Sequence, residues 1–392
     1  MCIRDSTKDT SSLDARTNLV LERMYTAEYI TYEEYQEALN DTLVVNEFSQ
    51  VTEMYEMPHF VEYAIHDVVT QLLESRELED TTQNRSTIEN ELMTKGYHIY
   101  TTVDPEIQNT VQETFENYDD YPALALQSDN VITQTNSDGS VTEIIQPQVS
   151  TVIIDNETGY LKAVIGSRTT PTTRQTINRA YQSKMPIGST IKPIAVYGPA
   201  LDNGAGLGTV IANIPTRIDG WNTEAGYPTT SYWRWGPVTI RQAIVHSINN
   251  AAARVITDIT TVDTAYEYLV KLGVSEDGLQ KDGVGLALGS SGICTLELTA
   301  AYACIANGGV YREPLSFTEV RDSQGNVILS AEDVQDTYRV FKESTAFMLL
   351  DAMEDVVSSG TGTRAQISGM TDRKSTRLNS SHLKLSRMPS SA

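Results

Sequence analysis

The sequence predicts an α+β fold, in which an antiparallel sheet packs against helices. The strand signal is a pair of β-rich runs, Thr151–Ile154 and Leu161–Ile165, which flank the turn Asn156–Gly159 and predict a hairpin. The helix signals are apolar residues at helical spacing in residues 7–43 and the apolar run that follows Ser189. We expect the hairpin to begin an antiparallel sheet onto which the helix starting near Ser189 packs.

Both ends of the chain differ in composition from the rest. Residues 372–392 carry five Lys or Arg against one Asp, although the whole chain has a net charge of −23. They match a conceptual translation of a sequencing-library adapter, and residues 1–6 match the end of a transposase adapter, so we expect both to be artefacts without a part in the fold. The tail has an excess of four positive charges and the head has none, which leaves −27 for residues 7–371. This charge argues against nucleic acid or anionic lipid as the main partner.

Cysteine and histidine usage predicts neither a disulfide nor a metal site. Cys294 and Cys304 would lie roughly 15 Å apart on one helix, too far for a bridge, and are expected to be buried thiols. His59 and His98 are isolated from other ligand residues, so we expect no metal and no cofactor. No run of about 18 apolar residues exists, and a membrane anchor would have to lie upstream.

The first third of the chain has its own helix and strand signals. Residues 7–43 are expected to be helical, and Thr31–Glu34 has the form of a capping box before a second helix. Residues 44–145 form a mixed connector with a β-rich run at Tyr97–Val103. Asp104 is the expected N-cap of the helix that follows this run.

The first motif with chemical meaning is the serine and lysine pair at the start of the second predicted helical region. Ser189 and Lys192 are three residues apart, which places both side chains on one face of a helix. A hydroxyl beside an amine is an activated nucleophile if burial keeps the amine neutral. The alternative is a helix N-cap and a solvated lysine. The spacing alone is weak evidence, because Ser381 and Lys384 in the adapter-like tail repeat it.

A second motif follows 58 residues after Ser189, at Ser247-Ile248-Asn249, within an apolar helical context. The alternative for Ser247 and Asn249 is a helix cap and a turn. A literal Ser-Asp-Asn occurs at Ser128–Asn130, but it precedes Ser189 and lies in the polar connector, so we interpret it as a chance match.

Several segments resemble the transpeptidase domain of class A penicillin-binding proteins, which are bifunctional peptidoglycan synthases. They are Asn178–Ala180, Gly188–Pro193, Trp235–Ala243, Leu286–Gly289, Thr299–Tyr302 and Gly360–Ala365. In addition, Arg16–Thr31 resembles the end of the glycosyltransferase domain of these proteins. The resemblance covers nearly all of residues 14–371. It implies that residues 7–43 are the end of a glycosyltransferase domain and that residues 146–371 are a transpeptidase domain, truncated before its last strands.

The resemblance implies an α+β, β-lactamase-like fold with a central antiparallel sheet and helices on both sides. It implies that Ser189 attacks a D-Ala-D-Ala stem peptide, forms an acyl-enzyme and reacts with β-lactams. Lys192 would be the base, Ser247 would relay a proton to the leaving group, and Asn249 would hold the substrate amide. The implied partners are peptidoglycan stem peptides, a lipid-linked precursor and β-lactams. The implied location is the extracytoplasmic face of a bacterial cell membrane, reached through an N-terminal anchor outside this sequence.

The chain departs from the family pattern at the third motif, Lys-Thr-Gly. Thr361-Gly362 lacks the lysine, and the pattern would place the motif a few residues beyond Thr371, where the adapter-like tail begins. Loss of an oxyanion-hole donor costs about 10²–10³ in rate, so the chain as written is expected to be inactive. A D,D-carboxypeptidase or β-lactamase-like serine hydrolase is one alternative, which the glycosyltransferase remnant disfavours. A non-catalytic penicillin-binding module is the other.

Overall fold

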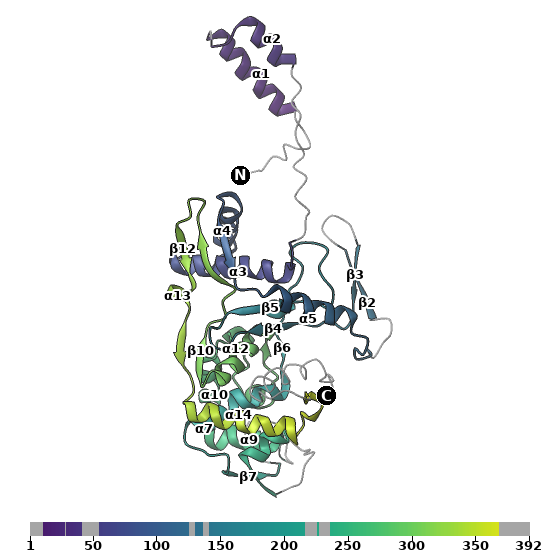
Figure 1. Cartoon of the computed structure of the whole chain (residues 1–392), viewed down its shortest axis with the longest axis vertical. Helices are drawn as coiled ribbons and strands as arrows, with labels where there is room; N and C mark the ends of the chain where they lie inside the picture. Colours follow the sequence, from purple (N-terminus) through teal and green to yellow (C-terminus); the bar gives the residue numbers. More distant parts are fainter. Residues whose placement is uncertain are drawn as a thin grey trace. The chain divides into compact units, whose positions relative to one another are not determined.

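The computed structural model describes residues 11–27, 29–40, 55–124, 130–135, 141–215, 226 and 236–367 (Figure 1). The chain divides into two compact units, Met1–Met54 and Tyr55–Ala392. The domain boundaries that the sequence suggests after residues 43 and 145 stay predictions.

The first unit is a pair of helices, α1 (Ser11–Thr26) and α2 (Tyr32–Asn40). The predicted capping box is confirmed, because the Glu34 N–H donates to Thr31 Oγ1 (3.2 Å) and the Thr31 N–H donates to Glu34 Oε2 (2.7 Å). Tyr25 of α1 stacks on Tyr35 of α2, with ring centroids 5.2 Å apart. The prediction of helices in this region is confirmed for its described part.

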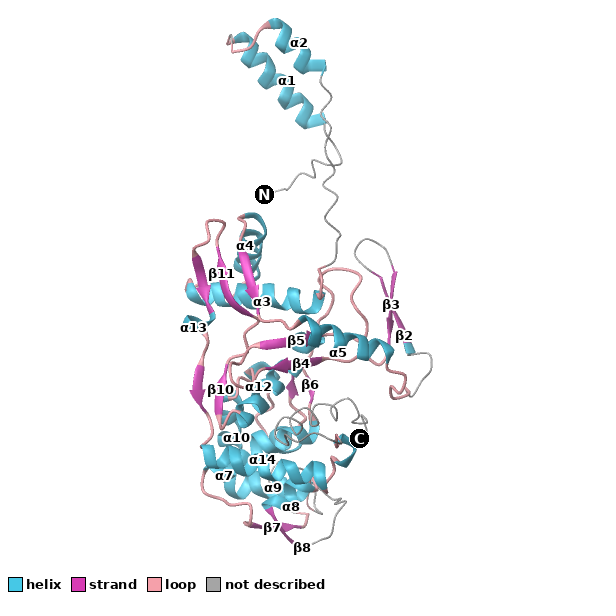
Figure 2. Cartoon of the chain, viewed as in Figure 1, coloured by secondary structure: helices cyan, strands magenta, loops and turns pink. Residues whose placement is uncertain are grey.

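The second unit begins with two helices and a three-stranded antiparallel sheet (Figure 2). The helices are α3 (Pro58–Ser75) and α4 (Thr82–Thr94). In the sheet, β1 (His98–Thr101) pairs with β11 (Phe317–Arg321), which also pairs with β12 (Val327–Ser330). Helices and sheet share a buried cluster that includes Val68, Leu72, Ile88, Phe317 and Val320. The β-rich run of the connector is thus confirmed as a strand, and its partner comes from late in the chain.

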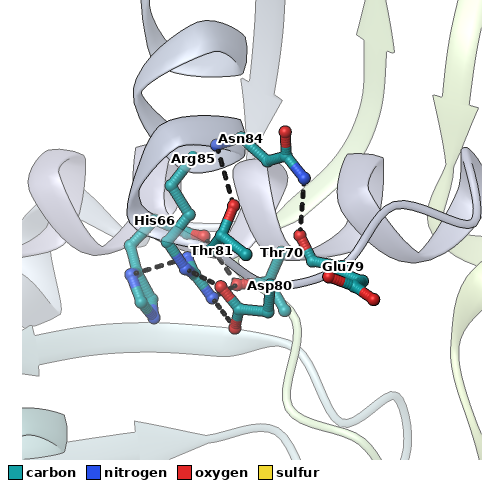
Figure 3. Close-up of polar contacts among 7 residues, drawn as sticks. All are labelled: His66, Thr70, Glu79, Asp80, Thr81, Asn84 and Arg85. Carbon is teal, nitrogen blue, oxygen red and sulfur yellow. Dashed lines mark hydrogen bonds and ion pairs between the residues drawn. The ribbon is translucent and has the colours of Figure 1, made fainter.

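Charged and polar contacts tie α3 to the start of α4 (Figure 3). The Arg85 guanidinium contacts both carboxylate oxygens of Asp80, at 2.5 and 2.7 Å. It also donates to Thr70 Oγ1 on α3 (3.2 Å) and lies 3.5 Å from His66 Nδ1. Arg85 of α4, held by Asp80 of the preceding turn, therefore fixes one side of α3.

The predicted hairpin is confirmed. β4 (Thr151–Ile154) and β5 (Leu161–Ile165) pair antiparallel, and Gly159 closes the turn with a φ of 77° that favours glycine. Helix α5 (Pro105–Asn117) packs against β5, and α12 (Thr295–Ala306) packs against β4. Helices therefore cover antiparallel strands, as expected for an α+β fold.

Side chains fix α5 at both its start and its sheet contact. The predicted N-cap is confirmed, because Asp104 Oδ1 accepts hydrogen bonds from the N–H groups of Glu106 and Ile107 (both 3.1 Å). The buried Gln108 amide exchanges hydrogen bonds with the backbone of Val164, at 2.8 and 3.0 Å. Gln108 thus satisfies backbone groups of β5 that lack a strand partner on that side.

The remaining described elements are short strand pairs and helices. The pairs are β2 (Val131–Thr135) with β3 (Val141–Ile145), β6 (Met185–Pro186) with β9 (Gly292–Ile293), β7 (Val210–Asn213) with β8 (Gly236–Thr239), and β10 (Val310–Arg312) with β13 (Thr337–Arg339). The helices are α6 (Arg179–Gln182), α7 (Gly198–Asp202), α8 (Ile240–Val245), α9 (Asn249–Val255), α10 (Val262–Lys271), α11 (Gly283–Leu288), α13 (Ala331–Val334) and α14 (Glu343–Ser358).

The largest buried cluster surrounds the segment that follows Ser189. This segment forms a 3₁₀ turn (Gly188–Thr190), then a π-helical turn (Lys192–Tyr197), and continues as α7. The predicted helix is present, but its first turns are not α-helical, and Pro193 within them has no N–H to donate. Helices α7, α9, α10 and α11 are its main packing partners, whereas the β4–β5 hairpin is covered by α3, α5 and α12.

Within the described ranges, no helix combines the length and apolar character needed to cross a membrane. Cys294 and Cys304 are buried free thiols, as predicted. The part of the chain that the structure describes contains no group of three His, Cys, Asp or Glu residues arranged for a metal. His59 lies 3.1 Å from Ser167 Oγ, and burial lowers its pKa to about 4.

Candidate active site

Ser189 lies in a turn that is held by backbone contacts with a second loop. The strand before it, β6, pairs with β9, and the Gly188 N–H donates to the Gly289 carbonyl (2.9 Å). Gly289 has a φ of 82°, and a Cβ at this position would stand 2.0 Å from the Gly188 oxygen. Only glycine allows the two loops to approach this closely, so Gly289 sets the distance between its own loop and the Ser189 turn.

Helix α12 holds the same turn through a side chain. The Tyr302 hydroxyl donates to the Thr190 carbonyl (2.7 Å), and Thr190 Oγ1 donates to the Ile187 carbonyl (2.6 Å). The residue directly after Ser189 is therefore anchored. The sequence interpretation gave Tyr302 no role, although a phenol among the small apolar residues of this helix is a signal for a specific hydrogen bond.

Lys192 is buried with 2% of its surface exposed, and its amine has three acceptors. Nζ donates to the Ser247 carbonyl (2.9 Å), to Ser247 Oγ (3.3 Å) and to Asn249 Oδ1 (2.5 Å). Burial disfavours the charged form and lowers the pKa of Lys192 from the usual 10.5 to about 7. At neutral pH a large fraction of this amine is therefore unprotonated and able to accept a proton.

Ser247 lies in a strained turn between two helices, as the family resemblance implies. Helix α8 ends at Val245 and α9 begins at Asn249, and Ser247 has a φ of 51°. A residue with a side chain adopts this left-handed conformation at a cost of about 1 kcal/mol or more. The turn directs both the carbonyl and the hydroxyl of Ser247 to Lys192.

The structure brings Lys192 together with both predicted residues of the second motif, which lie 55 and 57 positions later in the chain. It does not join Ser189 to Lys192 by a hydrogen bond, since Ser189 Oγ is not among the described partners of Nζ. The shared helix face was inferred from α-helical spacing, and the segment here is a 3₁₀ turn followed by a π-helical turn. The catalytic roles of the four residues stay predictions.

Helix α14 and the turn after it contact α8, the helix that leads into the second motif. Arg241 of α8 pairs with Asp355 (2.6 Å) and with Asp351, both on α14. The Thr361 N–H then donates to the carbonyl of Val245, the last residue of α8 (3.2 Å). The expected place of the Lys-Thr-Gly motif, and the chance matches at Ser128 and Ser381, lie outside the described residues.

Comparison with models of protein families identifies the family of this chain. Residues 149–374 match the family model of the penicillin binding protein transpeptidase domain. The chain belongs to this transpeptidase family.

Curated relatives of this transpeptidase chain are class A proteins, which confirms the resemblance. It is 30% identical over 370 residues to penicillin-binding protein 1A of Clostridium perfringens, covering 90% of this chain and 52% of that protein. It is 31% identical over 388 residues to penicillin-binding protein 1A of Clostridium botulinum, covering 95% and 44%. The chain thus spans about half the length of the curated relatives it matches.

Solved structures confirm the transpeptidase fold. Penicillin-binding protein 1A from Haemophilus influenzae superimposes with a TM-score of 0.55 at 21% identity, over 91% of this chain and 66% of that chain. PonA1 from Mycobacterium tuberculosis gives a TM-score of 0.58 at 21% identity, over 80% and 73%. The α+β class and the family fold predicted from the sequence are therefore correct.

Proposed function

We propose that the protein is a serine-type D,D-transpeptidase, which cross-links peptidoglycan stem peptides through an acyl-enzyme on Ser189. One observation carries the proposal: a buried lysine amine with a pKa near 7 lies three residues from this serine and contacts Ser247 and Asn249. A solvated lysine, the alternative considered for Lys192, would be exposed and would keep a pKa near 10.5.

In the first half-reaction, Ser189 Oγ attacks the carbonyl carbon of the D-Ala-D-Ala amide. The neutral Lys192 amine takes the hydroxyl proton, and the C=O electron pair moves onto the oxygen. When the pair returns, the C–N bond breaks and D-alanine leaves. Its nitrogen receives the proton from Lys192 through Ser247 Oγ, which is 3.3 Å from Nζ. An ester of Ser189 remains.

In the second half-reaction, the amine of a neighbouring stem peptide attacks this ester. The amine loses a proton to Lys192, the new amide bond forms, and Ser189 Oγ recovers its proton as the ester bond breaks. Asn249 uses Oδ1 to hold Lys192, which leaves its Nδ2 donors for a substrate carbonyl. The M. tuberculosis PonA1 structure in complex with penicillin V supports extending the same acylation to β-lactams.

The wider role of the protein is part of the same proposal. Residues 7–43 are the end of a glycosyltransferase domain that polymerises a lipid-linked precursor, residues 44–145 connect it to the transpeptidase domain, and residues 146–371 belong to the latter. The resemblance at Arg16–Thr31 supports this arrangement, as does the greater length of the penicillin-binding protein 1A relatives. The protein then acts at the extracytoplasmic face of the bacterial cell membrane, as part of cell-wall synthesis.

Covalent labelling tests the assignment of Ser189. Fluorescent penicillin is expected to label the protein expressed from its complete gene and to fail with Ser189→Ala. Ser128→Ala, in the chance Ser-Asp-Asn match, is the matched control and should label like wild type. Equal labelling of the two variants would refute the role of Ser189.

Product analysis separates a transpeptidase from a carboxypeptidase. A D-Ala-D-Ala peptide is incubated with and without an added acceptor amine. A transpeptidase forms a new amide with the amine, whereas a carboxypeptidase forms only the free acid.

A further inference from the structure

A cavity of about 190 Å³ lies between α3, α12 and the segment around β10, and none of the residues around Lys192 lines it. Its polar lining comes mainly from Tyr63, His66, Asp67 and Gln71 of α3 and from Tyr311 and Glu313 at the end of β10. The volume is many times what one water molecule needs. The cavity is therefore a separate feature that the reaction at Ser189 does not use.

Two tyrosine hydroxyls in this lining lack a protein partner. Tyr63 and Tyr311 are each 6% exposed, and neither hydroxyl has a hydrogen-bond partner in the part of the chain that the structure describes. The Tyr311 hydroxyl lies against Gly273, where a Cβ would stand 2.2 Å from it, and Gly273 also lines the cavity. Buried polar groups are almost always hydrogen-bonded, so the contents of the cavity must supply the partners.

The same lining has a surplus of negative charge. Asp67 is 6% exposed and uses Oδ2 to accept from the Ser316 N–H (2.8 Å) and hydroxyl (2.5 Å), while Oδ1 has no partner among the described residues. Glu313 accepts from Gln71 Nε2 (3.0 Å). Burial raises the pKa of Asp67 to about 6 and that of Glu313 to about 7, so Asp67 is mostly ionised at pH 7, and both acids are ionised at pH 8.

The charged groups around these two acids do not neutralise them. The negative charges of Asp67, Glu74 and Asp336 raise the pKa of Glu313 further, whereas the Asp336 N–H lowers it by donating to Glu313 Oε2 (3.3 Å). On α12, Glu297 is already paired with Lys184 (3.8 Å). No lysine or arginine is among the lining residues.

The α3 side of the cavity supplies no cation either. Burial lowers the pKa of His66, which keeps the imidazole neutral at pH 8. The Arg85 guanidinium touches His66 and Thr70 of the lining but is paired with Asp80 (Figure 3).

We propose that this cavity binds a primary ammonium group carried on a short aliphatic chain. An ammonium has three N–H donors and no acceptor, which fits the free Asp67 oxygen, Glu313 and the tyrosine hydroxyls. The aromatic rings of Tyr63 and Tyr311 favour a cation near their faces, and Leu296 and Ala300 give the chain an apolar wall. An anionic ligand would add to the unpaired negative charge.

Titration calorimetry of the whole chain with n-butylammonium chloride at pH 8 tests the proposal directly. At this pH both acids are ionised, and a primary amine keeps its proton because its pKa is about 10.4 in a lysine side chain. 1-Butanol is the neutral ligand of equal size, and sodium chloride controls for ionic strength. We expect saturable binding of butylammonium only, and weaker binding at pH 5, where both carboxyls are protonated.

Three variants assign the binding to the cavity. Asp67→Asn keeps the acceptor for Ser316 but removes the charge, and is expected to weaken binding at least about tenfold. Ala300→Leu fills the cavity with a good helix former and should abolish binding. Glu332→Gln, an exposed carboxyl-to-amide change on α13, should bind like wild type.

Three outcomes would overturn the proposal: butylammonium gives no saturable heat, 1-butanol binds equally well, or Asp67→Asn and Ala300→Leu leave the Kd of butylammonium unchanged. In each case the cavity holds water only. Where a variant does not fold, intermolecular NOEs in the wild-type chain decide. Contacts between the butyl methylenes and the rings of Tyr63 and Tyr311 are required, and their absence refutes the site. None of these outcomes depends on acylation of Ser189.

Discussion

The buried amine of Lys192 makes a strong prediction about pH. If neutral Lys192 is the base, the acylation rate follows the unprotonated fraction of this amine, which is half at its pKa of about 7. Lowering the pH from 8 to 5 reduces this fraction, and hence the rate, about a hundredfold. With the ordinary pKa of 10.5, the neutral fraction at pH 7 would be smaller by about a thousandfold.

The assay is the second-order rate constant of acylation by fluorescent penicillin between pH 5 and pH 11, measured on the protein expressed from its complete gene. Circular dichroism at each pH confirms that the fold persists. Lys192→Arg provides the matched variant, because a guanidinium keeps the charge but does not deprotonate in proteins. We expect this variant to acylate about 10²–10⁴-fold more slowly at pH 8.

Three results would refute the reasoning. A rate that stays constant from pH 5 to pH 8 would show that Lys192 does not titrate in this range. A Lys192→Arg variant that acylates within a few-fold of wild type would show that the residue acts only through its charge. A rise centred near pH 10 would place the amine in water, contrary to its 2% exposure.

Three further predictions concern Lys192 and two residues that hold the Ser189 turn, Tyr302 and Gly289. The folded state binds the proton on Lys192 less well than the unfolded state, so the stability of the wild type falls as the pH drops from above 10 to below 7. Lys192→Met has no group that titrates at this position. Its free energy of unfolding in chemical denaturation should therefore rise relative to wild type by about 3–5 kcal/mol as the pH falls from 10 to 6. Tyr302→Phe removes the donor to Thr190, and should slow acylation about tenfold while lowering stability by only about 1 kcal/mol; an unchanged acylation rate would mean that Tyr302 serves packing alone. Gly289→Ala would place a Cβ 2.0 Å from the Gly188 oxygen, and should cost about 2–4 kcal/mol in thermal unfolding and reduce penicillin labelling of the folded fraction.

Features that depend on neighbouring residues in the chain were predictable from the sequence. The β4–β5 hairpin needs only two apolar runs and a turn with glycine, and Asp104 and the Thr31–Glu34 box satisfy N–H groups within three residues of themselves. The second motif was identified through the family resemblance of Trp235–Ala243, the segment just before it, and the structure places Ser247 between two helices as the resemblance implies.

Features that depend on the tertiary fold were not predictable. The pairing of β1 with β11 joins segments that local patterns cannot connect, and the hydrogen bond from Tyr302 to Thr190 spans 112 positions. The α-helical spacing assumed for Ser189 and Lys192 failed for a related reason. Helical periodicity does not distinguish an α-helix from the 3₁₀ and π-helical turns that the packing of this segment imposes.

The three acceptors around Lys192 suggest how one site can both hold and move a proton. An ammonium has three N–H groups, and the Ser247 carbonyl, Ser247 Oγ and Asn249 Oδ1 use all of them. A neutral amine has only two N–H groups and one lone pair, so one acceptor loses its donor when Lys192 deprotonates. The carbonyl and the amide oxygen can only accept, whereas the hydroxyl can rotate and donate to the lone pair; at 3.3 Å it is also the longest of the three contacts. We therefore expect the Lys192–Ser247 hydrogen bond to reverse on each protonation change. The Ser247 hydroxyl gives up the lone pair when Ser189 transfers its proton to Lys192, and it then accepts from the ammonium while it donates its own proton to the leaving group.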